Sequence, residues 1–285
     1  MATHPKTRWT VVLGALALGA CSMWGGGGTE PRAPGGSLFP RVRSLHAPRV
    51  VDPKDGESRT VVVGYSVEGR PIRCTFLGRG EALVLVLAAI HGDEAAGAPL
   101  VRRLQRTLED NPDLLQNRRV ALIAVANPDG LVHGLRLNVR GIDINRNFPA
   151  YNWREGTRRG PRALSEPETR ALHKVIRDHQ PVRIISIHQP LRLIDYDGPA
   201  RGVAKAMGRR TNLSVRKMRK RRGSLGAFAG RTLGIPTVTL ELPDRASELD
   251  ISQLWARYGD ALLASIRWPR PLQDGGARSH ARSEP

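Results

Sequence analysis

Runs of consecutive, mostly apolar residues recur four times along the chain, at residues 82–90, 120–126, 183–188 and 236–243. Runs of this length are typical of strands that are buried on both faces, as in a parallel sheet covered by helices. Between the first two runs, apolar side chains recur every three or four positions from 98 to 108 and predict a helix that packs on the sheet. This alternation predicts an α/β fold: a single domain whose mixed, mostly parallel twisted sheet is flanked by helices.

Local signals predict further elements around these strands. Residues 60–72 predict two strands joined by a glycine-containing turn, and residues 247–266 predict a closing helix. The sequence Asn-Pro-Asp-Gly at 127–130 directly follows an apolar run and predicts a tight turn. Ser165, with Glu168 three residues later, predicts a capping box at the start of another helix.

Two of the predicted strands are followed by residue types that bind metals. His91 and Glu94 follow the first apolar run across a glycine-containing turn, and His188 ends the third run. Open α/β sheets hold their ligands at the carboxyl ends of their strands, and two His with one Glu can bind zinc and leave a position for water. The sequence therefore predicts a metal site of His91, Glu94 and His188; the alternative is that these side chains are only hydrogen-bonded.

Two polar features accompany this site. Glu241 is the one acid in the apolar run 236–243, and a buried carboxylate is costly unless it has a partner or lies at a functional site. Residues 134–149 are too polar for a core and contain several guanidinium and amide groups. Such groups suit the binding of a carboxylate or a developing oxyanion, and the alternative is an ordinary surface loop.

The N-terminal sequence is typical of an exported bacterial protein. Basic residues precede an apolar stretch at 9–20 that is too short to span a bilayer comfortably, so residues 1–20 predict a signal peptide. The stretch ends Leu-Gly-Ala-Cys, which resembles the lipobox of bacterial lipoproteins, with Cys21 as the lipidated residue. We expect a cell-envelope lipoprotein in the outer membrane, facing the periplasm; the alternative is an ordinary signal peptide with an unmodified Cys21.

Composition divides the rest of the chain. Residues 21–58 are rich in Gly and Pro and lack periodic apolar positions, which is typical of a flexible tether. The predicted elements fall within residues 59–268, the folded domain, and the polar tail at 269–285 is expected to be disordered. Once Cys21 is lipidated, Cys74 is the remaining cysteine, so no disulfide is expected and Cys74 is predicted to be buried.

The chain is strongly basic, with a formal net charge of +19 and a dense basic run at 216–222. Aromatic residues do not interleave with the basic ones, so no nucleic-acid partner is expected. The charge indicates either a solvated basic surface or attraction to an anionic polymer such as a cell wall or membrane surface. No feature of the sequence specifies an oligomeric state.

Four short motifs occur in a fixed order: His-x-x-Glu at 91–94, Asn-Arg-Asn at 145–147, Ser-Ile-His at 186–188 and Thr-Leu-Glu at 239–241. Together they resemble the zinc metallocarboxypeptidase superfamily and, within it, the bacterial murein peptide amidase branch. The resemblance extends over residues 60–266 and implies a zinc-carboxypeptidase-like fold. It also implies one Zn2+ held by His91, Glu94 and His188, with Glu241 as the general base.

The same resemblance implies roles for residues of the polar segment. Asn145 and Arg146 match the pair that binds the terminal carboxylate of the substrate. Arg136 matches the arginine that stabilises the oxyanion, and Arg140 is the alternative because the loop is short here. The family's carboxypeptidases carry a mobile Tyr before the final Glu, whereas the corresponding stretch here, residues 215–223, contains no Tyr.

Residues 189–200 resemble the murein peptide amidases, whose substrate contains diaminopimelate, an amino acid with an additional amine. Asp195 and Asp197 are therefore expected to bind an ammonium group, and the alternative is a simple Asp-Gly turn. The implied function is zinc-dependent hydrolysis of the γ-D-glutamyl-diaminopimelate bond of murein peptides. Three alternatives stay open: a zinc carboxypeptidase of other peptides, a zinc deacylase of small acylated amino acids, and an inactive wall-binding lipoprotein.

Overall fold

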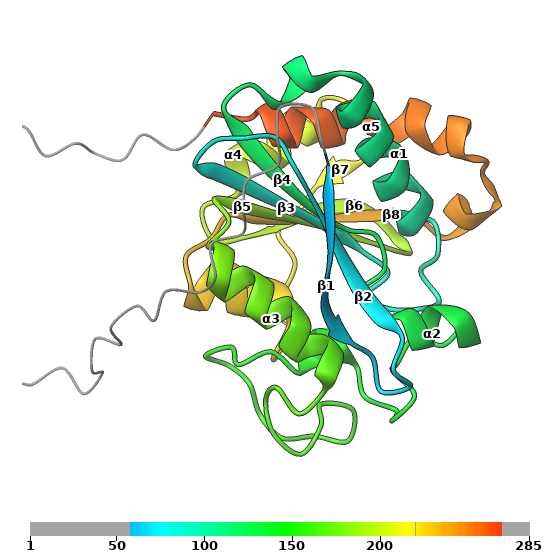
Figure 1. Ribbon diagram of the computed structural model, residues 1–285. Helices are drawn as coiled ribbons and strands as arrows, with labels where there is room; N and C mark the ends of the chain where they lie inside the picture. The colour runs from blue at the N-terminus through cyan, green and yellow to red at the C-terminus, as the bar shows by residue number, and fades with distance from the viewer. Residues whose placement is uncertain (1–57, 220, 270–285) are drawn as a thin grey trace, which may run out of the picture. The chain divides into compact units, whose positions relative to one another are not determined.

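The computed structural model describes residues 58–219 and 221–269 of the chain (Figure 1). The predicted signal peptide, the lipidation site Cys21, the tether up to residue 57 and the tail from residue 270 lie outside the described residues and stay predictions. Within the described ranges, no helix is both long enough and apolar enough to cross a membrane.

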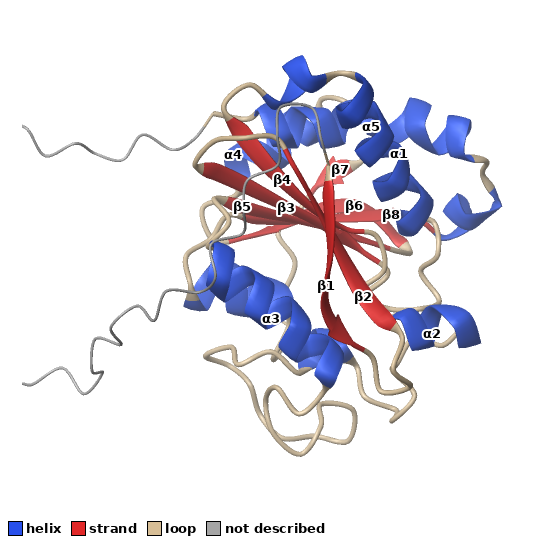
Figure 2. Cartoon of the chain, in the orientation of Figure 1, coloured by secondary structure: helices blue, strands red, loops and turns tan. Residues whose placement is uncertain are grey.

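One sheet of eight strands runs through the described residues, in the order β1-β2-β4-β3-β5-β8-β6-β7 (Figure 2). The strands are β1 (Arg59–Tyr65), β2 (Pro71–Leu77), β3 (Ala82–Ala88), β4 (Arg118–Ile123), β5 (Arg183–His188), β6 (Leu191–Asp197), β7 (Ser214–Val215) and β8 (Thr237–Pro243). The central strands β4, β3, β5 and β8 are parallel to one another, while β1, β2 and β6 form antiparallel pairs. The predicted mixed, mostly parallel α/β sheet is confirmed.

Helices cover both faces of this sheet (Figure 1). One face packs against α1 (Gly97–Asp110), α4 (Arg201–Gly208) and α5 (Ile251–Arg267), and the other against α3 (Pro167–His179). Successive residues of β3 join different cores: Val84 and Val86 pack toward the three helices, whereas Leu83 and Leu85 pack toward α3. Because strand side chains alternate between faces, a strand covered on both sides must be apolar throughout, which explains the uninterrupted runs.

Shorter helical turns connect these elements. They are η1 (Pro112–Leu115), α2 (Pro128–His133), η2 (Ile144–Arg146), the π-helical turn η3 (Gly226–Thr232) and η4 (Asp244–Glu248). The prediction of a tight turn at 127–130 is wrong, because the chain continues into α2 there. The Asn127 side chain accepts a hydrogen bond from the backbone N–H of Gly130, and Pro128 occupies the first helical position, where its missing N–H has no cost.

The predicted capping box at Ser165 and Glu168 is also wrong. The helix α3 begins one residue later than predicted, with Glu166 at the N-cap position and no side-chain cap. Ser165 instead donates its hydroxyl to Glu166, and Glu168 accepts from the backbone N–H of Val67. The Ser165 hydroxyl also accepts from the side-chain amide of Asn147 at 2.9 Å, so both side chains of the predicted capping motif have partners distant in sequence.

The predicted closing helix is present in two parts, and Cys74 is buried as predicted. The predicted helix at 247–266 is divided into η4 and α5, because Asp250 and Gln253 form a reciprocal capping box that starts α5. Cys74 is fully buried in β2, and burial raises the pKa of its thiol to about 12. It is therefore a small core residue rather than a reactive one.

Candidate metal centre and its pocket

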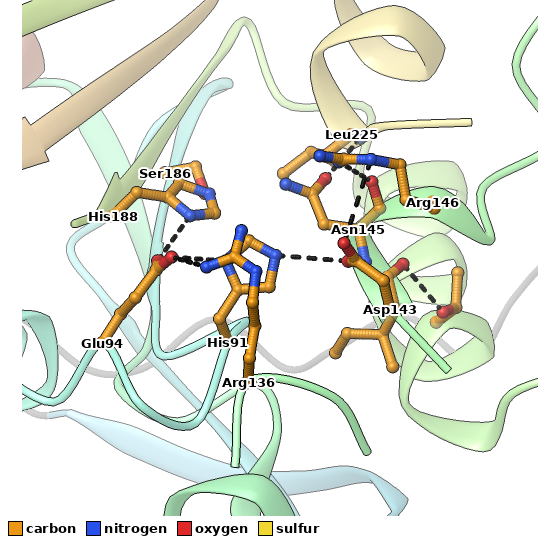
Figure 3. Close-up of polar contacts among 11 residues, drawn as sticks. His91, Glu94, Arg136, Asp143, Asn145, Arg146, Ser186, His188 and Leu225 are labelled. Carbon is orange, nitrogen blue, oxygen red and sulfur yellow. Dashed lines mark hydrogen bonds and ion pairs between the residues drawn. The ribbon is translucent and has the colours of Figure 1, made fainter. Parts of the chain in front are cut away.

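Three predicted ligands meet at the carboxyl ends of β3 and β5. His91 and Glu94 lie in the turn between β3 and α1, and His188 is the last residue of β5. All three are buried, and one ligand atom from each lies within 4.8 Å of the other two. Glu94 accepts from Nδ1 of His91 at 2.7 Å and from Nδ1 of His188 at 2.8 Å (Figure 3). Nδ1 of His91 and Nδ1 of His188 therefore both face the Glu94 carboxylate. The three side chains could in this way bind a single ion.

The opposite nitrogen of each ring is held by a further side chain. Nε2 of His188 lies 2.9 Å from the hydroxyl of Ser186, and Nε2 of His91 lies 3.2 Å from a carboxylate oxygen of Asp143 (Figure 3). Histidines that bind metals are usually fixed in this way, because a partner on the outer nitrogen sets the tautomer and the ring orientation. This arrangement of donors and outer partners fits a zinc ion.

The three ligand side chains also shape the local charge. Burial raises the pKa of Glu94, but hydrogen bonds from His188 and His91 outweigh burial and hold this pKa far below the ordinary value. Burial lowers the pKa of His91, while hydrogen bonds to Asp143 and Glu94 raise it and prevail. An ionised carboxylate buried between two imidazoles is a strong site for a cation.

A cavity of about 210 Å³ opens beside these ligands. Strand pairing explains its lining: in register, His188 of β5 pairs with Glu241 of β8, and Thr239 of β8 pairs with Asp195 of β6. Since every second residue of a strand points to the same face, the polar residues of three strands are directed into one space. The polar side chains from these strands that line it are Ser186, His188, Asp195, Asp197, Thr237, Thr239 and Glu241.

The two arginine alternatives are separated by the structure. Arg136 lines the cavity and donates to Glu94 over 2.7 Å, beside the metal ligands (Figure 3). Arg140 does not line the cavity; its guanidinium is half exposed and lies 3.7 Å from a carboxylate oxygen of Glu166. Of the two, Arg136 is the one positioned to contact a group bound at the metal centre.

Asn145 and Arg146 lie on the wall across from Glu94 (Figure 3). The side-chain oxygen of Asn145 accepts from the backbone N–H of Leu225 at 2.9 Å, so its amide N–H groups are left for another partner. Arg146 is 16% exposed and lies 3.8 Å from Asp143. Burial lowers the pKa of Arg146, Asp143 raises it, and the nearby Arg221 and Arg136 lower it further. This pair presents donors and positive charge to a carboxylate.

Glu241 has an unusual environment. Its Oε2 atom is buried and has no hydrogen-bond partner among the described residues. Burial raises the pKa of this carboxyl group, His188 lowers it and Glu94 raises it, with a net increase. A carboxylate that is desolvated and unpaired beside a metal site is suited to accept a proton.

Asp195 and Asp197 line the cavity but differ in their partners. Both residues belong to β6, and the chain turns directly after Asp197 at Gly198, whose φ is +63°. An Asp-Gly turn is therefore present, and the binding of an ammonium group stays a prediction. Asp197 is 17% exposed, lies 3.4 Å from Arg231 through one oxygen, and has its other oxygen close to the backbone of Gly226, where an added Cβ would approach it to 2.3 Å. Asp195 accepts two backbone N–H groups on Oδ1 alone. Its Oδ2 has no partner in the part of the chain that the structure describes.

Sequence reasoning missed Asp143, Ser186, Thr237, Thr239, Arg219 and Arg221 as residues of this site. Thr237, Thr239 and Glu241 alternate with apolar residues along β8, and Ser186 alternates with His188, so a period of two was the available signal. No local signal marks Asp143. Nothing in the sequence distinguishes Arg219 and Arg221 from the other basic residues of the run 216–222.

Comparison with known proteins agrees with this geometry. A sequence model described as zinc carboxypeptidase matches residues 54–254. The chain belongs to the zinc carboxypeptidase family. The resemblance inferred from the ordered motifs is thereby confirmed. With the buried triad, family membership also confirms one Zn2+ as the cofactor.

Similar proteins within the family include murein peptide amidases. Murein peptide amidase A of Escherichia coli strain K12 is 39% identical over 118 residues, covering 36% of this chain and 47% of the relative. The chain thus spans about half the length of this relative. Murein peptide amidase A of Vibrio campbellii is 30% identical over 202 residues, covering 64% of this chain and 77% of that protein.

Solved structures share the fold. The murein-tripeptide amidase of Escherichia coli O157 superposes with a TM-score of 0.62 at 28% identity, over 78% of this chain and 97% of that one. Thrombin-activatable fibrinolysis inhibitor superposes with a TM-score of 0.63 at 20% identity, over 73% of this chain and 70% of that one. The second likeness concerns the fold alone.

Proposed function

We propose that this protein is a zinc-dependent amidase that hydrolyses the γ-D-glutamyl-diaminopimelate bond of murein peptides. The observation that carries the proposal is the cavity beside the metal triad. It combines carboxylate-binding donors at Asn145 and Arg146 with an acid, Asp195, that keeps an oxygen available. The murein peptide amidases among its relatives support the choice of substrate class.

In this proposal His91, Glu94 and His188 hold the zinc ion. When bound, zinc supplies a Lewis acid that polarises the amide carbonyl and lowers the pKa of water to about 7. Glu241 accepts the proton of the attacking water on its unpaired carboxylate and delivers it to the leaving amine. Arg136 donates to the carbonyl oxygen as negative charge develops there, a kind of contact often worth about 3 kcal/mol.

The leaving residue is held on the opposite wall. Arg146 and Asn145 bind the carboxylate that follows the scissile bond, since both donors face the cavity. Asp195 binds the side-chain ammonium of diaminopimelate through Oδ2. Asp197 has a supporting role, because it already has an ion-pair partner in Arg231.

This arrangement predicts a strong preference for a substrate with the side-chain amine. L-Ala-γ-D-Glu-diaminopimelate should be cut at least about tenfold faster than the same peptide with 2-aminopimelate, which lacks only the side-chain amine and so leaves Asp195 desolvated and unpaired. The measurement is kcat/KM for both peptides with the zinc-loaded protein. Asp195→Asn should reduce the preference mainly by slowing the better substrate, whereas Asp197→Asn should reduce it less.

Equal kcat/KM values for the two peptides on the wild-type protein would contradict the amidase proposal. That outcome would favour a carboxypeptidase of other peptides. Turnover of small acylated amino acids instead of either peptide would favour the deacylase alternative. Zinc binding without turnover of any of these substrates would favour the wall-binding alternative.

We further propose that the protein acts in the cell envelope, anchored through lipidated Cys21. The proposal rests on the Leu-Gly-Ala-Cys sequence at 18–21 and on the Gly- and Pro-rich stretch behind it. Cys21→Ser should move the protein from the membrane fraction to the soluble fraction. Fractionation with an antibody, together with the intact mass of the wild-type protein, provides the measurement. A soluble wild-type protein whose mass includes no lipid would contradict the anchor.

A further inference from the structure

The cavity beside the metal triad contains more positive charge than the roles above use. Four arginines line it, Arg136, Arg146, Arg219 and Arg221. Arg136 contacts Glu94, and Arg146 lies near Asp143. In the described part of the chain, neither Arg219 nor Arg221 has an ion pair, although both line a cavity that contains acids. A cationic group placed without a partner beside a substrate pocket suits an anionic group of the substrate.

The backbone around these arginines is fixed to the site on both sides. The N–H of Met218 donates to Asp195 at 2.8 Å, and the N–H of Leu225 donates to Asn145 at 2.9 Å. Gly223, with φ of +65°, accepts at its carbonyl from the N–H of Phe148 at 3.0 Å. Two of these acceptors are the side chains that hold the leaving residue in the proposed function. The position of Arg221 is therefore tied to the pocket it lines.

The charge of Arg221 acts on several groups that line this cavity. Burial is the main influence on the pKa of Asp195, Arg146 and Glu241, and the charge of Arg221 acts on all three in the direction that lowers the pKa. The backbone carbonyl of Arg221 also accepts from the N–H of Ser224 at 3.3 Å, and Ser224 lines the same cavity. Arg221 thus lines the same cavity as the acid that would bind an ammonium and the arginine that would bind the main carboxylate.

We propose that Arg221 binds a second carboxylate of the substrate and that Arg221 and Asp195 together form a receptor for an amino-acid zwitterion at the end of the leaving residue's side chain. The inference rests on the proposed function, because diaminopimelate ends in an ammonium and a carboxylate on one carbon. Asp195 provides an acceptor and Arg221 a planar fork of donors, which match these two groups.

The test uses peptides that remove one group at a time from L-Ala-γ-D-Glu-diaminopimelate. Lysine in place of diaminopimelate keeps the terminal ammonium and removes the distal carboxylate, while D-isoglutamine in place of D-Glu removes the carboxylate on the acyl side. On the wild-type protein, the diaminopimelate peptide should exceed the lysine peptide in kcat/KM by at least about tenfold, the usual scale for a lost charge-assisted hydrogen bond. Arg221→Gln should bring this ratio close to one, and Arg221→Lys should restore part of it.

Arg222→Gln is the matched control. It removes the same charge from the neighbouring position, and Arg222 is exposed and does not line the cavity. It should therefore leave the ratio at the wild-type value. A second measurement that needs no turnover is the dissociation constant of free diaminopimelate, compared with that of free lysine, by calorimetry on the zinc-loaded protein. Arg221→Gln should raise the dissociation constant of diaminopimelate about tenfold and change the dissociation constant of lysine little.

The possible outcomes separate this inference from the function on which it rests. If the wild-type protein fails to cut the diaminopimelate peptide, the proposed function itself is wrong. If the wild-type protein cuts it but Arg221→Gln leaves the ratio unchanged, only the role of Arg221 is overturned. The role of Arg221 is also overturned if Arg219→Gln brings the ratio of the two kcat/KM values to one and Arg221→Gln does not. If Arg221→Gln abolishes discrimination against the D-isoglutamine peptide instead, the carboxylate bound lies on the acyl side and the zwitterion receptor is overturned.

Discussion

Glu241→Gln should retain zinc and lose turnover by a factor of about 10³ or more. General-base catalysis contributes roughly 10² to 10⁴ to the rate, and an amide in this place can neither accept nor deliver the proton. The substitution conserves size, and Glu241 provides no ligand atom to the triad, so zinc affinity should change little. The measurements are the zinc content by atomic emission and kcat with the diaminopimelate peptide.

The matched comparison for this variant is Thr239→Val. Thr239 lines the same cavity two residues earlier on β8 but has no titratable group. It should retain zinc and most of the turnover, which distinguishes loss of the base from a general disturbance of the strand. Substantial turnover by Glu241→Gln would remove the base assignment and leave the zinc site intact.

His91→Ala and His188→Ala should each lose zinc as well as turnover. Removal of one of three protein ligands takes away a metal bond and also leaves Glu94 with one imidazole neighbour instead of two. We expect each variant to be purified with less than about a tenth of the wild-type zinc. Zinc content, together with the concentration of a chelator needed to inactivate the protein, provides the measurement.

Ser186→Ala provides the control for these ligand variants. The Ser186 hydroxyl contacts the outer nitrogen of His188 and not the ion. Its loss should therefore lower zinc affinity about tenfold, the usual scale for such partners, and should not abolish binding. Circular dichroism separates loss of metal from loss of fold. Full zinc content in both His→Ala proteins would mean that the ion is held elsewhere.

The sequence by itself determined the fold class and the metal triad. Strands buried on both faces must be apolar throughout, so they were visible as runs such as 82–90. His91, Glu94 and His188 were identifiable because each lies at or just after the end of such a strand, and parallel strands end at a common edge. Glu241 was identifiable because an isolated acid in an apolar strand requires a functional or structural reason.

The tertiary structure alone decided the rest of the pocket. Asp195 and Asp197 are equivalent in sequence, yet among the described residues only Asp197 has an ion pair, with Arg231 of the turn η3. The choice of Arg136 over Arg140 and the inclusion of Arg221 depend on where loops distant in sequence are tied together. The capping box predicted at Ser165 failed for the same reason, since Asn147 donates to Ser165 and the backbone N–H of Val67 donates to Glu168. Local patterns encode which face of an element is buried, whereas these contacts depend on how remote segments meet, which no short stretch of sequence specifies.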